Sequence, residues 1–119
     1  MPSTSLAGRS ILIVEDEPLI ALEIVSAFQN AGAVALTARS LTEAIHLVEH
    51  DGLSAAVLDF GLGDGDADAV CARLDERHIP FILHSGYTLH GPTCGRGTVI
   101  PKPARPETLI ETVVGLLRR

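Results

Sequence analysis

The stretch SILIVEDEP, residues 10–18, decides the architecture of this chain of 119 residues. Its apolar part, residues 11–14, has no alternation of polar and apolar residues, which is typical of a strand buried on both faces of a sheet. Two carboxylates, Glu15 and Asp16, follow the strand directly, and Pro18 suits the first turn of a helix. A buried strand that leads into a helix is the beginning of an α/β unit.

The same order of a short apolar run and a helical pattern returns along the rest of the chain. Further strands are predicted at about 33–37, 53–58, 80–84 and 98–100, and helices at 19–28, from the capping-box sequence 40–43 to Gly52, at 67–74 and at 107–117. Strands of this kind, separated by helices, form parallel sheets with helices on both faces. We expect a doubly wound α/β domain with five parallel strands over residues 10–119, preceded by a flexible polar tail over residues 1–9.

Composition narrows the classes of function. The formal net charge of −6 argues against nonspecific binding to nucleic acid or to an anionic membrane. No apolar run approaches the ~18 residues of a membrane span, and the first residues lack the layout of a signal peptide. Cys71 and Cys94 do not have the spacing of metal ligands, and a reduced, cytoplasmic chain is favoured over a bond between them.

Polar side chains with chemical functions follow the predicted strands. Glu15 and Asp16 follow the first strand, Asp59 the third, Ser85 the fourth and Lys102 the fifth. Lys102 is the only lysine of the chain, beside eight arginines, and the two cation types are not interchangeable at a tight site. Ligands of doubly wound sheets bind at the carboxyl ends of the strands. We therefore expect these five residues to gather at one edge.

Carboxylates that gather in one crevice repel each other unless a cation offsets their charge. Carboxylate and carbonyl oxygens favour Mg²⁺, so Asp16, Asp59 and the backbone carbonyl of Gly61 are its predicted ligands. Asp59 is also the candidate nucleophile, because it ends the run expected to be the central and most buried strand and precedes a glycine-rich loop. Its carboxylate could form an aspartyl phosphate, with Lys102 and the Ser85 hydroxyl each stabilising one phosphoryl oxygen.

These motifs, in this order, resemble the response-regulator receiver domain of two-component signalling. The motifs are ILIVEDEP at 11–18, VLD ending at Asp59, HSG around Ser85 and PKP around Lys102. The stretch 80–87, PFILHSGY, is similar to the subgroup of single-domain receivers nicknamed FATGUY. The likeness covers residues 10–118.

The resemblance implies a flavodoxin-like fold with strand order 2-1-3-4-5. It implies that a histidine kinase or phosphotransfer protein phosphorylates Asp59 and that the modified chain changes its binding to a downstream protein. Asp16 would bind Mg²⁺ directly and Glu15 through water, Ser85 would be the switch hydroxyl, and the bond from Lys102 to Pro103 would be cis. Apart from its own phosphorylation and dephosphorylation, no enzyme activity is implied.

The chain also departs from the family pattern. Val99 stands where many receivers have an aromatic switch residue, and Tyr87 is the only aromatic residue near the site. The segment between Ser85 and Lys102 is short and glycine-rich, which predicts that the fourth helix is short or missing. His84 is expected as a half-buried core residue on the face of the sheet opposite the Ser85 side chain.

Two other functions stay open. One is a phosphatase with an aspartate nucleophile, although Asp59-Phe60-Gly61 lacks the second aspartate of the usual Asp-x-Asp motif. The other is a phosphorylation-independent interaction module on the same fold. The broad apolar face of the last helix, which includes Leu109, Val113 and Leu117, could also form the contact of a homodimer. The kinase and the output pathway are not named by any motif.

Overall fold

Five parallel strands form one sheet in the order β2-β1-β3-β4-β5. The computed structural model describes residues 5–59, 67–85 and 97–118, without the side chains of Asp59 and Ser85. The strands are β1 (Ser10–Val14), β2 (Val34–Ala38), β3 (Leu53–Asp59), β4 (Phe81–Ser85) and β5 (Thr98–Pro101). Every neighbouring pair is parallel. The predicted fold class and the strand order 2-1-3-4-5 are confirmed.

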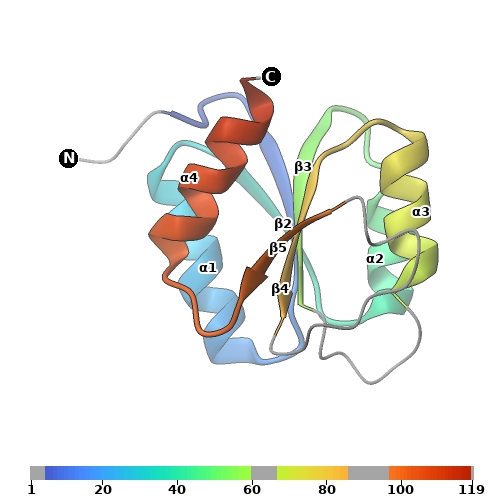
Figure 1. Ribbon diagram of the computed structural model, residues 1–119, viewed down its shortest axis with the longest axis horizontal. Coiled ribbons are helices and arrows are strands. Elements are labelled where there is room, and N and C mark those ends of the chain that lie inside the picture. The colour runs from blue at the N-terminus through green and yellow to red at the C-terminus, as the bar shows by residue number, and fades with distance from the viewer. Residues whose placement is uncertain (1–4, 60–66, 86–96, 119) are drawn as a thin grey trace.

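The helices cover both faces of the sheet (Figure 1). One face carries α1 (Pro18–Asn30) and α4 (Pro106–Leu117), and the other carries α2 (Leu41–Leu47) and α3 (Asp68–Glu76). This arrangement confirms the doubly wound prediction. The second helix is shorter than expected, because it ends at Leu47 and a turn then leads to Gly52, whose φ of 81° is in the left-handed region.

The core consists of two layers, one on each face of the sheet. From β1, Leu12 and Val14 lie in the layer under α2 and α3, whereas Ile11 and Ile13 lie in the layer under α1 and α4. All four side chains are at most 1% exposed. Burial on both faces explains why this strand has no polar alternation, and it stabilises the fold by about 1.5–3 kcal/mol for each such side chain.

Local signals place the helix ends as the sequence predicted. Pro18 begins α1, and the Ser40 hydroxyl accepts a hydrogen bond of 3.1 Å from the backbone N–H of Glu43 at the start of α2. Gly32 follows α1 with a φ of 96°, and a Cβ at this position would lie 3.1 Å from the backbone nitrogen of Ala7. A glycine is therefore required here for both conformation and space.

An exposed ion pair joins the two helices on the second face. The Arg73 guanidinium on α3 donates hydrogen bonds of 2.5 and 2.8 Å to the carboxylate of Glu49, which follows α2. These bonds to the guanidinium hold the pKa of the Glu49 carboxyl below its usual value. The pair contributes stability at neutral pH, and the contribution is lost in acid as Glu49 is protonated.

The structure bears on two expectations from composition, the absence of a membrane span and the reduced state of the cysteines. None of the helices in the described part of the chain is both long enough and apolar enough to cross a membrane. Cys71 is buried and disulfide-bonded, so the expectation of a reduced chain is wrong for this residue. Cys94, Gly61 and Tyr87 lie outside the described residues, as does the segment 86–96 in which the fourth helix was predicted to be short or missing.

A first prediction concerns Gly97, immediately before β5. A Cβ at Gly97 would lie 2.5 Å from Cε2 of Phe81 and 3.2 Å from Cγ of Leu83, both buried side chains. We expect Gly97→Ala to lower the free energy of unfolding by roughly 1–3 kcal/mol, because the core must shift. Gly115→Ala is the matched control, since its Cβ would meet nothing within 4 Å. In urea denaturation the control should gain up to about 1 kcal/mol, and an unchanged Gly97→Ala would contradict the packing argument.

Candidate functional site

The register of the sheet brings the ends of four strands to one edge. Across β1 and β3, Val14 is the partner of Leu58, so Glu15 and Asp59 come next on neighbouring strands. Asp59 is in turn the partner of His84 across β3 and β4. Neighbouring strands lie about 4.8 Å apart, so the backbone at Asp59 lies between the ends of β1 and β4.

The fifth strand completes this edge. Ser85 at the end of β4 is the partner of Pro101 on β5, and Lys102 follows Pro101 directly. Two strand spacings, about 10 Å, separate the backbone of β5 from that of β3. The sheet therefore brings Asp16, Asp59, Ser85 and Lys102 to one edge, although more than eighty residues separate the first from the last in sequence.

The two carboxylates after β1 have different surroundings. The backbone N–H of Glu15 extends the sheet by donating to the carbonyl of Ala38 at 3.0 Å, and the Glu15 side chain is only 3% exposed. Its Oε2 accepts a hydrogen bond of 3.3 Å from the backbone N–H of Glu17, which caps α1. The positive end of the helix dipole thus favours the negative charge of Glu15. Asp16, in contrast, is exposed.

A pocket of about 260 Å³ joins this edge to α1. Its polar lining consists of Glu15 and Glu23, of His84 from β4 and of Lys102 after β5, and the apolar lining includes Ile24. His84 is 6% exposed, so it is more buried than expected, and it was not among the predicted site residues. The alternation of side chains along β4 could have predicted this position. His84 is two residues from Ile82 and so lies on the same face of the sheet, and the Ile82 side chain lies under α1 and α4.

The connection after β5 has the geometry that the family resemblance implied. The peptide bond between Lys102 and Pro103 is cis, and the Lys102 side chain is exposed. Val99, at the position of the family's aromatic switch, is 44% exposed on β5. Because residue 99 is a valine, the aromatic switch side chain of the family is absent at this position.

The proposed metal ligands are only partly within the described residues. Asp16 and Glu15 are described, whereas the side chain of Asp59 and the carbonyl of Gly61 are not. In the part of the chain that the structure describes, no three acidic, histidine or cysteine side chains form a metal site. The chemistry of the donors nevertheless fits Mg²⁺, since the described members offer carboxylate oxygens at the end of a strand beside β3.

Comparison with known proteins decides the family. The sequence pattern of the response regulator receiver domain matches residues 11–114. This chain belongs to that family. Regulatory protein VanR of Enterococcus faecium is 30% identical over 115 residues, covering 92% of this chain and 50% of VanR. The receiver domain described here thus spans about half the length of VanR.

Solved receivers have the same fold. A CheY-like receiver domain protein from Methanospirillum hungatei JF-1 is 22% identical with a TM-score of 0.82, covering 92% of this chain and 94% of its own. The receiver domain of sensor histidine kinase PA1611 from Pseudomonas aeruginosa PAO1 is 20% identical with a TM-score of 0.80, covering 95% and 100%. Because both sequence identities are below 25%, these two structures show a shared fold only. Membership of the FATGUY subgroup stays a prediction.

Proposed function

We propose that this receiver accepts a phosphoryl group on Asp59 from the phosphohistidine of a histidine kinase or phosphotransfer protein, and that the modification switches the binding of a downstream protein. The observation that carries the proposal is the register of the sheet, which brings the strand ends bearing Asp16, Asp59, Ser85 and Lys102 to one edge. Such an edge is where ligands bind in doubly wound sheets.

The proposed reaction moves one phosphoryl group between two proteins. A carboxylate oxygen of Asp59 forms the new bond to phosphorus, and the bond between phosphorus and the histidine nitrogen breaks. The electron pair of that bond leaves on the imidazole. Lys102 and the Ser85 hydroxyl each stabilise one of the three phosphoryl oxygens, over which the transition-state charge is spread.

A divalent metal completes the proposed site. Asp16 and Asp59 would hold it with carboxylate oxygens, the carbonyl of Gly61 would be a third ligand, and Glu15 would act through water. When bound, Mg²⁺ supplies the positive charge that offsets the carboxylates and the incoming phosphoryl group. The donor types support this assignment. Further support comes from the PA1611 receiver, which was solved with a magnesium ion coordinated in its active site cleft.

The first turns of α1 offer a surface for the phosphodonor protein. Leu19 and Leu22 are 75% and 62% exposed, and their spacing of three residues puts them on one side of the helix. They follow Asp16 by only three and six residues. Large exposed apolar side chains beside a reactive edge are typical of a protein contact.

The first test of the function is the mass of the intact protein after incubation with acetyl phosphate and Mg²⁺. We expect one addition of ~80 Da, the mass of a phosphoryl group, because Asp59 is the nucleophile. The addition should be lost in Asp59→Asn and when Mg²⁺ is chelated. A folded chain that gains no mass would contradict the proposal and favour the phosphorylation-independent module.

A second test measures metal binding alone. Titration with Mg²⁺, followed by amide shifts in NMR spectra, should show saturable binding that Asp16→Asn weakens at least about tenfold, because a charged ligand is lost. Glu17→Gln removes the next exposed carboxylate along the chain and is the matched control. Equal effects of the two substitutions would exclude Asp16 as a specific ligand.

A third test separates docking from chemistry. We expect Leu19→Ser/Leu22→Ser to slow transfer from a phosphorylated histidine-containing phosphotransfer protein about tenfold or more, because exposed anchor residues are lost. Phosphorylation by acetyl phosphate should keep its rate. Val34→Ser, a substitution of a residue 56% exposed on β2, is the control. A slower reaction with acetyl phosphate as well would show that the leucines act on the site itself.

A further inference from the structure

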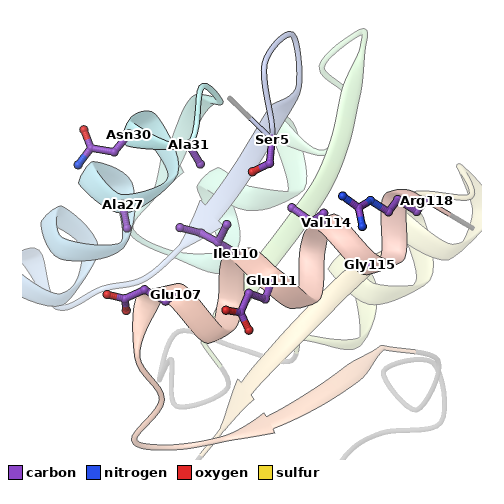
Figure 2. A pocket seen from close by; sticks show the side chains of 10 residues that line it. All are labelled: Ser5, Ala27, Asn30, Ala31, Glu107, Ile110, Glu111, Val114, Gly115 and Arg118. Carbon is purple, nitrogen blue, oxygen red and sulfur yellow. The ribbon is translucent and has the colours of Figure 1, made fainter. Parts of the chain in front are cut away.

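A crevice between α1 and α4 contains a pocket of about 810 Å³ (Figure 2). Ala27, Asn30 and Ala31 line it from α1, and Ser5 also lines it. From α4 the lining residues are Glu107, Ile110, Glu111, Val114, Gly115 and Arg118. A separate, smaller pocket beside Lys102 lies against the same helix, one to two turns nearer the carboxyl edge of the sheet, at Ile20, Glu23 and Ile24. We name the larger pocket the α1–α4 groove.

Small side chains on α1 leave this groove open. Ala27 and Ala31 are one turn apart and both line the pocket, where longer side chains would fill the space against α4. Opposite them, Ile110 and Val114 are only half-buried, and Figure 2 shows both pointing into the groove. The floor of the groove is therefore apolar and partly open to water.

Carboxylates border this apolar floor. Glu107 and Glu111 are exposed and four residues apart on α4, an arrangement of like charges that destabilises a helix. In the described part of the chain neither carboxylate forms a salt bridge, and Figure 2 shows Arg118 at the other end of the pocket. Glu23 is a further exposed carboxylate on α1, in the separate pocket that Lys102 also lines. The α4 side of the groove is thus negatively charged at Glu107 and Glu111.

We propose that the α1–α4 groove binds a basic amphipathic helix of another protein. An apolar stripe with the spacing i, i+3 or i+4, i+7 would pack on Ala27, Ile110 and Val114, the mode in which a helix binds in a groove. Lysine or arginine residues beside that stripe would meet Glu107 and Glu111. Since α4 has 12 residues, a partner helix of about 12 residues, roughly 18 Å, matches its length.

The negative charge of the chain and of the groove favours a basic partner helix over a second copy of this chain as the occupant. The formal net charge is −6, and two copies facing each other through this groove would bring acidic borders together. Such a contact is unfavourable unless cations pair with the carboxylates. The proposed contact does not depend on phosphorylation of Asp59, so it can be measured on the unmodified chain without Mg²⁺.

The test uses a designed helical peptide of about 14 residues, with a leucine stripe flanked by lysines. Fluorescence anisotropy of the labelled peptide should show saturable binding that weakens with salt. Glu107→Gln/Glu111→Gln should weaken it about fivefold, the fold-change that ~0.5 kcal/mol for each of two exposed ion pairs gives. Glu43→Gln/Asp51→Asn neutralises two exposed carboxylates away from the groove and should leave binding unchanged.

A second variant tests the groove without changing charge. Ala27→Leu adds a larger side chain to the lining, and we expect it to abolish peptide binding while the urea midpoint stays equal or rises. A peptide in which every lysine is replaced by glutamate should not bind. The proposal is overturned by equal binding of the two peptides, by no binding of the lysine peptide, or by equal effects of both neutralised pairs. Dimerisation in sedimentation that Ala27→Leu abolishes would also overturn it in favour of a second copy.

Discussion

The parallel backbone ladder of β1, β3 and β4 is the constraint on which the candidate site depends. Parallel pairing directs the carboxyl ends of all strands to one edge, and the register decides which residues are neighbours there. The central strand β3 is buried over Ala55–Leu58, so neither face can turn toward water without losing the core. This burial holds the backbone at Asp59 between β1 and β4 before any ligand or partner is present.

The face under α1 and α4 combines the candidate site with the two surfaces that we propose for other proteins. Leu19 and Leu22 are exposed at the start of α1, next to the strand ends. Further along the same helix, Ala27 and Ala31 leave space against α4, so the helix pair is grooved rather than closed. One helix therefore orients Glu15 through its N-terminus, carries an apolar surface beside the site and forms one wall of the groove. A partner bound in the groove would also lie beside the smaller pocket that contains Lys102.

Most of the fold could be predicted from local patterns. The buried run before Glu15, the proline that begins α1 and the Ser40 cap all act over a few residues, so their effect is visible along the chain. Two predictions, the end of the second helix and the reduced state of Cys71, were wrong because local patterns do not contain contacts between distant residues. The second helix ends at Leu47, before the glycine that the pattern indicated. Cys71 is disulfide-bonded, which depends on which residue lies near it in space.

The sequence by itself determined the types of residue that follow each strand, and therefore the chemistry available at the edge of the sheet. It also determined the order of strands and helices, because the periodicity of apolar residues is a local property. Only the tertiary structure decided that Asp59 is the partner of His84, that His84 shares a pocket with Glu15 and Lys102, and that α1 and α4 leave a groove between them. Strand register and helix packing depend on side chains that are far apart in sequence and touch only in the folded chain.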